Sequence, residues 1–166
     1  GYHALSNMDI EKVEPYGNDT ALDKYIFRES VPMSTYLTVF IVSDFTSRSS
    51  KVNVSGYNPF DLRIFSTPAQ ESKTEYALGV SKSIIEYYIN YFKIDYPLPK
   101  LDLAAIPDFV SGAMETWGLI TYRETNLLYD PLISSTSNKQ RICAVIAHEF
   151  AHMWFGNLVT MRVSEP

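Results

Sequence analysis

Residues 148–152 read His148-Glu149-Phe150-Ala151-His152, with two histidines four positions apart. On an α-helix, side chains with this spacing lie one above the other on the same face. Two imidazoles so placed can hold one Zn²⁺, and the glutamate beside the first can take a proton from a zinc-bound water. The pattern predicts His148 and His152 as metal ligands and Glu149 as general base. The alternative is a chance match on a buried helix.

The flanking residues favour a helix around this motif. A polar loop at 134–138 precedes it, and Ser137 followed by Gln140 fits a capping box. Gly156 supplies a C-terminal stop. Apolar side chains surround much of the circumference, so we expect a buried helix whose histidines line a dry wall. These side chains are Ile142, Val145, Ile146 and Phe150.

Composition limits the classes of protein to which the chain can belong. Of 166 residues, 46% are hydrophobic and 14% aromatic, which is typical of a globular protein with a well-filled core. The net charge of −5 argues against a nucleic-acid partner. The single cysteine, Cys143, falls in the predicted helix and is expected to be inert. Glycosylation sequons begin at Asn18 and Asn53, which favours an extracellular setting.

The remaining pattern predicts a β-rich first part followed by mixed strands and helices. A helical apolar period runs over residues 71–92, and the Pro97–Pro99 region ends it. The division between the two parts is expected near residue 45. The expected strands are residues 2–8, 25–28, 36–42, 52–54, 62–65, 101–106, 118–122 and 126–129.

Three stretches, in this order, resemble the M1 family of zinc aminopeptidases, gluzincins of the aminopeptidase N and aminopeptidase A type. Residues 4–8 are similar to the stretch that closes the family's N-terminal β domain. Residues 112–115, Gly-Ala-Met-Glu, are similar to the family's exopeptidase motif, Gly-Ala-Met-Glu-Asn. Residues 148–161 resemble the zinc helix and the segment after it, and residues 119–129 resemble the family as well. The resemblance extends over nearly the whole chain up to Met161.

The resemblance implies an α+β fold in two parts. Residues 1–45 would be the C-terminal edge of an N-terminal β-sandwich-like domain. Residues 46–166 would be the N-terminal part of a thermolysin-like mixed α/β catalytic domain, which they leave incomplete.

The resemblance also implies roles for individual residues. His148 and His152 would be zinc ligands and Glu149 the general base. Glu115 would bind the free α-amine of a peptide substrate through a charge-assisted contact, which restricts cleavage to the first residue. Three neighbours would complete the substrate site: Gly112 within the same motif, Ala113 through backbone hydrogen bonds, and Met114 in the first side-chain pocket. Spacing alone predicts only a zinc hydrolase of amides or esters.

Two departures from the family pattern affect the predicted function. Thr116 replaces the usual Asn, and a hydroxyl lacks the two donors of a carboxamide. The family's third zinc ligand, a Glu, would fall at position 171, after Pro166. The last five residues differ from the family's run, and Glu165 has the wrong spacing to substitute.

Two hypotheses follow. The first is a zinc aminopeptidase acting on peptides with a free N-terminus, placed extracellularly or at the cell surface, with a homodimer expected for the parent protein. The alternative is a truncated, non-catalytic form that binds peptides or a full-length partner.

Overall fold

The computed structural model describes residues 1–17 and 19–161 of the chain. Two sequence-based predictions therefore lie outside the described residues: the sequon at Asn18 and the tail with Glu165. Asn53, in the second sequon, is exposed, and its glycosylation stays a prediction. Across the described ranges, no helix combines the length and hydropathy needed to cross a membrane.

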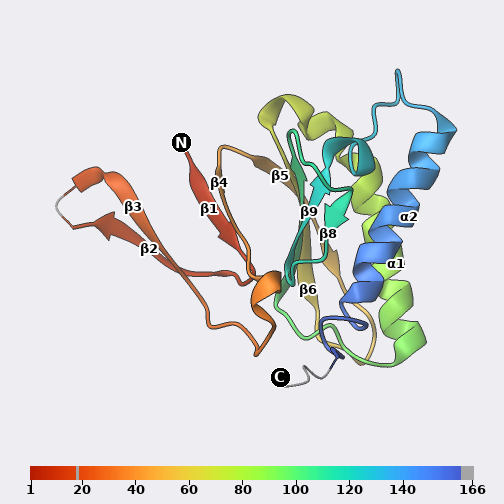
Figure 1. Ribbon diagram of the computed structural model, residues 1–166, viewed down its shortest axis with the longest axis horizontal. Helices are drawn as coiled ribbons and strands as arrows, with labels where there is room; N and C mark the ends of the chain where they lie inside the picture. Colours follow the sequence, from red (N-terminus) through yellow and green to blue (C-terminus); the bar gives the residue numbers. More distant parts are fainter. Residues whose placement is uncertain (18, 162–166) are drawn as a thin grey trace, which may run out of the picture.

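A five-stranded mixed sheet forms the centre of the fold (Figure 1). The three inner strands run parallel, and each edge strand is antiparallel to its neighbour. Helix α1 (Glu75–Phe92) connects the first two parallel strands, because parallel neighbours need a long crossover. In spatial order the strands are β5 (Thr46–Val52), β6 (Phe60–Ser66), β7 (Lys100–Ile106), β9 (Leu119–Arg123) and β8 (Ala113–Met114).

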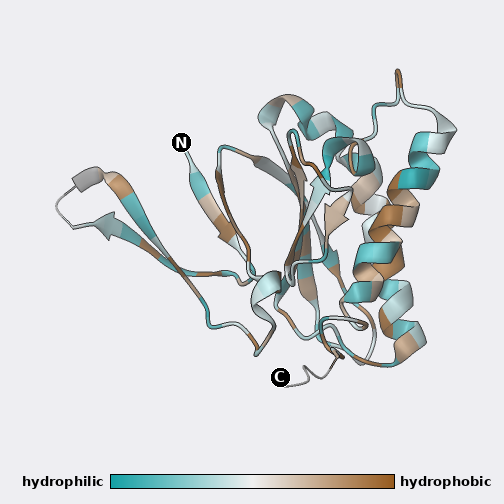
Figure 2. Ribbon diagram, in the orientation of Figure 1, coloured by the Kyte–Doolittle hydropathy of each residue, from teal (hydrophilic) through white to brown (hydrophobic). Residues whose placement is uncertain are grey.

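Each face of this sheet packs against a different layer. Along β7, Leu101 and Leu103 point into the main core, which the sheet shares with α1 and α2 (Thr136–His152). Ala104 follows Leu103, points to the opposite face and belongs to a second cluster with Leu5 and Phe65, as the two-residue period of a strand requires. Figure 2 shows the hydrophobic residues concentrated in the central strands and on the two helices. The inner strands are therefore buried on both faces.

The second cluster is covered by a ribbon of β1 (His3–Ser6) and β4 (Phe40–Ser43). A hairpin of β2 (Ile10–Tyr16) and β3 (Asp19–Phe27) projects away from the rest of the molecule (Figure 1). The ribbon ends at Ser43 and the central sheet begins at Thr46. Division into two domains at residue 45 stays a prediction about the longer protein.

The α+β class is confirmed, and several predicted boundaries are wrong. Residues 36–42 were expected as one strand, but Thr35–Leu37 is a 3₁₀-helix and only β4 is extended. Residues 126–129 form no strand, since a 3₁₀-helix at Glu124–Asn126 leads into irregular backbone. The first helix starts at Glu75 because a 3₁₀-helix, Pro68–Lys73, occupies its expected first turn. Strands β2 and β8 are absent from the predictions, and the strand expected at residues 52–54 is instead β5, which ends at Val52.

Candidate active site

Helix α2 carries the histidine motif, and its first turn differs from the prediction. Ser135, not Ser137, is the N-cap: its hydroxyl accepts from the Asn138 backbone N–H, and the Asn138 side chain accepts from the Ser135 N–H. The capping box is therefore real but lies two residues earlier, with Asn in place of Gln. The helix ends at His152, four residues before Gly156.

The two histidines converge at the C-terminal end of α2. Their Nε2 atoms lie 3.2 Å apart, and the rings are nearly perpendicular, at 85°. Two nitrogens bound to one tetrahedral Zn²⁺ at 2.0–2.1 Å would be about 3.3 Å apart, so the pair fits one zinc ion. The prediction of a dry wall is wrong, because His148 is exposed and His152 half-buried.

His152 is oriented by the backbone that follows the helix. Its Nδ1 lies 3.0 Å from the carbonyl oxygen of Phe155. A carbonyl can only accept a hydrogen bond, so Nδ1 is the donor, and the neutral ring then presents the lone pair of Nε2. Such backbone support of a histidine ligand is usual in metal sites.

Glu149 lies between the histidines in sequence and is only 5% exposed. Its Oε2 atom has no hydrogen-bond partner among the described residues. Burial, and secondarily the negative charge of Glu115, raises the pKa of Glu149 to about 7, while His152 acts in the opposite direction. A buried carboxyl with this pKa is suited to general acid–base chemistry near neutral pH.

Three residues of the predicted exopeptidase motif share cavities with the histidines. Gly112 and Ala113 share a small pocket of about 350 Å³ with His148 and Glu149. Glu115 lines a larger groove of about 840 Å³ together with His152. Met114 follows Ala113 in strand β8 and lines neither of these two cavities. The structure thus brings Gly112, Ala113 and Glu115 to cavities shared with the histidine motif, but not Met114, and the roles of all four stay proposals.

The backbone of Glu115 is tied to the segment after α2. The Asn157 side-chain Nδ2 donates to the carbonyl oxygen of Glu115 at 3.0 Å. Asn157 is buried, and the same amide group also contacts the sulfur of Met153. The Thr116 hydroxyl donates to the Leu119 carbonyl within its own turn. Thr116 is thus used locally and is buried.

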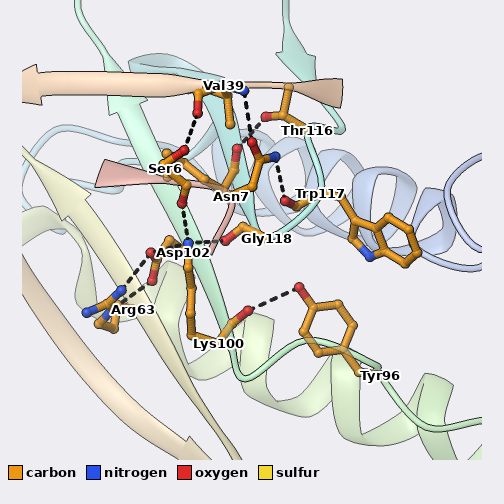
Figure 3. A network of polar contacts seen from close by, with 11 residues as sticks. Ser6, Asn7, Val39, Arg63, Tyr96, Lys100, Asp102, Thr116, Trp117 and Gly118 are labelled. Carbon is orange, nitrogen blue, oxygen red and sulfur yellow. Dashed lines mark hydrogen bonds and ion pairs between the residues drawn. The ribbon is translucent and has the colours of Figure 1, made fainter. Parts of the chain in front are cut away.

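A buried polar network supports the turn that follows Glu115 (Figure 3). The Lys100 ammonium donates to the carbonyls of Ser6 at 2.6 Å and Gly118 at 2.8 Å. It also pairs with Asp102 at 2.8 Å, and Asp102 in turn receives two hydrogen bonds from Arg63. The network joins β1, β6 and β7 to this turn.

Asn7 forms the second connection in the same view (Figure 3). Its Nδ2 donates to the carbonyls of Leu37 and Trp117, both at 2.8 Å, and its Oδ1 accepts from the Val39 N–H. Every polar atom of this side chain is therefore satisfied, which fixes the N-terminal segment against the turn after Glu115.

Sequence reasoning missed these supporting residues. Asn7 and Asn157 lie in stretches that resemble the family but have no role assigned there, Lys100 lies in none of these stretches, and each acts on backbone that is distant in sequence. Their signal is a strongly polar side chain in an otherwise apolar context. Within residues 1–17 and 19–161, no group of three or more His, Cys, Asp or Glu is placed to hold a metal ion, so this stretch offers the two imidazoles alone.

Comparison with known proteins places this site in context. The chain is 52% identical to glutamyl aminopeptidase of Rattus norvegicus over 160 residues and 52% identical to aminopeptidase A of Gloydius brevicauda. It is 56% identical to endoplasmic reticulum aminopeptidase 2 of Bos taurus over 159 residues. Each match covers 96% of this chain and 16% of the relative's length. These names give no support to the binding-only alternative, since all three are aminopeptidases.

A family model described as the peptidase family M1 domain matches residues 76–164. That range contains α1 except for its first residue, β7, the Gly112–Glu115 motif and the whole of α2. It is more than half of the chain, and the predicted resemblance is confirmed. The chain belongs to peptidase family M1.

Proposed function

We propose that this chain contributes the zinc-binding helix and the amine-binding glutamate of an aminopeptidase that removes N-terminal residues from peptides. One observation carries the proposal: the Nε2 atoms of His148 and His152 converge to 3.2 Å, the spacing of two ligands on one zinc ion. The names of the relatives supply the class of reaction. A third protein ligand, usual in catalytic zinc sites, would come from outside the described residues.

Bound zinc would polarise the scissile carbonyl and lower the pKa of a coordinated water. The chain's own residues would do the rest. Glu149 would take the proton of that water through its unpartnered Oε2 and pass it to the leaving amine. Glu115 lines the groove beside His152 and would pair with the substrate's α-ammonium group.

The peptide would enter between the two cavities that flank the histidines. Gly112 and Ala113 line the pocket with His148, and Ala113 would offer backbone hydrogen bonds to an extended substrate. Met114 would contact the first side chain. We place the longer protein outside the cell or at its surface, as a membrane-associated glycoprotein that forms a homodimer.

The direct test is hydrolysis of a panel of fluorogenic aminoacyl amides by the longer protein, which would carry the third ligand, supplied with zinc. Glu149→Gln keeps the size of the side chain and removes the base, so activity should fall by a factor of about 10² to 10⁴. Glu29→Gln, at an exposed position, is the matched control and should leave the rate unchanged.

A second arm addresses Glu115. The enzyme should cleave substrates with a free α-amine and leave N-acetylated ones intact, and Glu115→Gln should raise KM for the free amines. Equal hydrolysis by the wild-type protein and Glu149→Gln would overturn the proposed mechanism. Equal cleavage of free and acetylated substrates would overturn the role of Glu115.

A further inference from the structure

The chain folds back on itself directly after α2, in a segment that we name the closing turn, residues 153–159. The Asn157 N–H donates to the His152 carbonyl at 3.0 Å, and the Val159 N–H donates to the Trp154 carbonyl at 2.9 Å. The Gly156 N–H donates to the Val159 carbonyl at 2.8 Å. These bonds give the closing turn one defined backbone path against the end of the helix.

Two side chains fix the closing turn to the rest of the fold. Trp154 is 3% exposed, packs on Phe92 of α1 with ring centroids 5.2 Å apart, and donates its indole N–H to the Ile94 carbonyl. On the other side, Asn157 holds the Glu115 carbonyl. The Phe155 carbonyl therefore has a fixed position from which to accept the hydrogen bond of His152.

Gly156 allows the backbone to adopt the path that puts the Phe155 carbonyl beside His152. Its φ of +127° is one that L side chains rarely adopt, and a Cβ there would lie 3.3 Å from His152 Nδ1. A side chain at 156 would crowd the ring nitrogen that donates to Phe155 and would turn the peptide that carries the acceptor.

We infer that Gly156 is a positioning residue for the zinc site: it lets the Phe155 carbonyl hold His152 as the Nδ1–H tautomer, with the Nε2 lone pair aimed at the position between the two rings. The expected effect on zinc affinity rests on the proposed function. The tautomer itself is a property of the protein alone.

The first measurement uses the wild-type chain without added metal. Nitrogen-15 NMR of the histidine rings distinguishes a protonated Nδ1 from a protonated Nε2. His152 should be the Nδ1–H tautomer. A protonated Nε2 and a bare Nδ1 on neutral His152 would overturn the inference, and this arm needs no variant to fold.

The second measurement compares two glycine variants. Gly56 also has a positive φ, of +86°, but a Cβ there meets nothing within 4 Å, so Gly56→Ala imposes backbone strain without touching the site. Gly156→Ala should mix the tautomers of His152 and weaken zinc binding about 10- to 100-fold, measured by competition with a chelator. Gly56→Ala should retain the wild-type ring signals and zinc affinity.

The two failures are distinguishable. Folded Gly156→Ala with wild-type His152 signals and zinc affinity would overturn the role of Gly156. A wild-type chain that binds no zinc would contradict the proposed metal site, while the ring measurement would still decide whether Phe155 holds the tautomer. Loss of affinity in both variants would assign the effect to strain and also overturn the inference.

Discussion

The side-chain amide of Asn157 donates a hydrogen bond of 3.0 Å to the backbone carbonyl of Glu115. This bond joins the segment after the histidine helix to the strand end that carries the proposed amine anchor. In the proposed site, the distance between the two histidines and Glu115 would decide which peptide bond reaches the metal. A single buried amide therefore helps to set the register of the proposed cleavage.

Asn157→Asp should destabilise the chain by about 2–4 kcal/mol at neutral pH, because a buried carboxylate would face a carbonyl oxygen with no donor between them. Urea unfolding followed by circular dichroism measures this change. Asn53→Asp, at an exposed position, is the matched control and should stay within about 0.5 kcal/mol of the wild type. A similar small change for Asn157→Asp would show that the contact with Glu115 is dispensable.

Lys100→Met should be far more costly than Lys51→Met, although both lysines pair with an aspartate at 2.8 Å. The Lys100 and Asp102 side chains are 4% and 1% exposed, so removing the cation leaves a buried carboxylate with Arg63 alone. We expect a loss of about 3–5 kcal/mol.

The Lys51–Asp61 pair is open to solvent, and its loss should cost at most about 1 kcal/mol. The two free energies of unfolding are compared in the same denaturant series. Equal costs for the two variants would mean that the network in Figure 3 does not stabilise the turn after Glu115.

Tyr122→Phe should leave the free energy of unfolding nearly unchanged at pH 7. It should also reduce the fall in stability at alkaline pH. The Tyr122 hydroxyl is buried and has no hydrogen-bond partner among the described residues, and burial raises its pKa well above 10. In the unfolded chain the phenol ionises near pH 10, so above that pH the folded state holds the extra proton and stability falls as pH rises.

Tyr96→Phe is the informative comparison, since burial also raises the pKa of Tyr96 well above 10, but its hydroxyl donates to the Lys100 carbonyl. Tyr96→Phe should lower the free energy of unfolding by about 0.5–1.5 kcal/mol at pH 7. Like Tyr122→Phe, it should also reduce the fall in stability above about pH 10. Unfolding free energies between pH 7 and about pH 11 test both. If the unfolding free energy of Tyr122→Phe falls with pH as steeply as that of the wild type, the raised pKa of Tyr122 is not a cause of the alkaline loss of stability.

Gly118→Ala should prevent stable folding or cost more than about 4 kcal/mol. A Cβ at Gly118 would lie 2.1 Å from the Asn7 backbone oxygen, and its φ of +89° already disfavours a side chain. Gly56→Ala has a similar φ with open space around it and should cost about 1 kcal/mol. Thermal unfolding of the two variants separates steric overlap from backbone strain, and similar melting temperatures would exclude the overlap.

Local sequence patterns predicted the elements whose burial follows a simple period. Strands β6, β7 and β9 are rich in apolar residues because both faces of the sheet are covered, and α1 shows its stripe of core residues. The strand β2 was missed because its side chains are largely exposed and give no apolar alternation. The 3₁₀-helix at Thr35–Leu37 was missed because tertiary contacts override β propensity there.

In the candidate site, too, some residues could be predicted from local sequence and others could not. The motif of His148, Glu149 and His152 is local, so its spacing alone indicated a metal-binding helix. The residues that support it act across 42 positions for Asn157 and Glu115, 94 for Lys100 and Ser6, and 110 for Asn7 and Trp117. No period or motif encodes such contacts, and only the folded chain reveals them.

In the proposed site, His148 and His152 together bind one zinc ion. Calorimetric titration of the purified chain with Zn²⁺ tests it, with variants at each of its three histidines. The wild-type chain and His3→Ala should bind one equivalent, because His3 lies in β1 and outside the site. His148→Ala and His152→Ala should each abolish that binding. Retention of zinc by either of these two variants, or its loss in His3→Ala, would contradict the account.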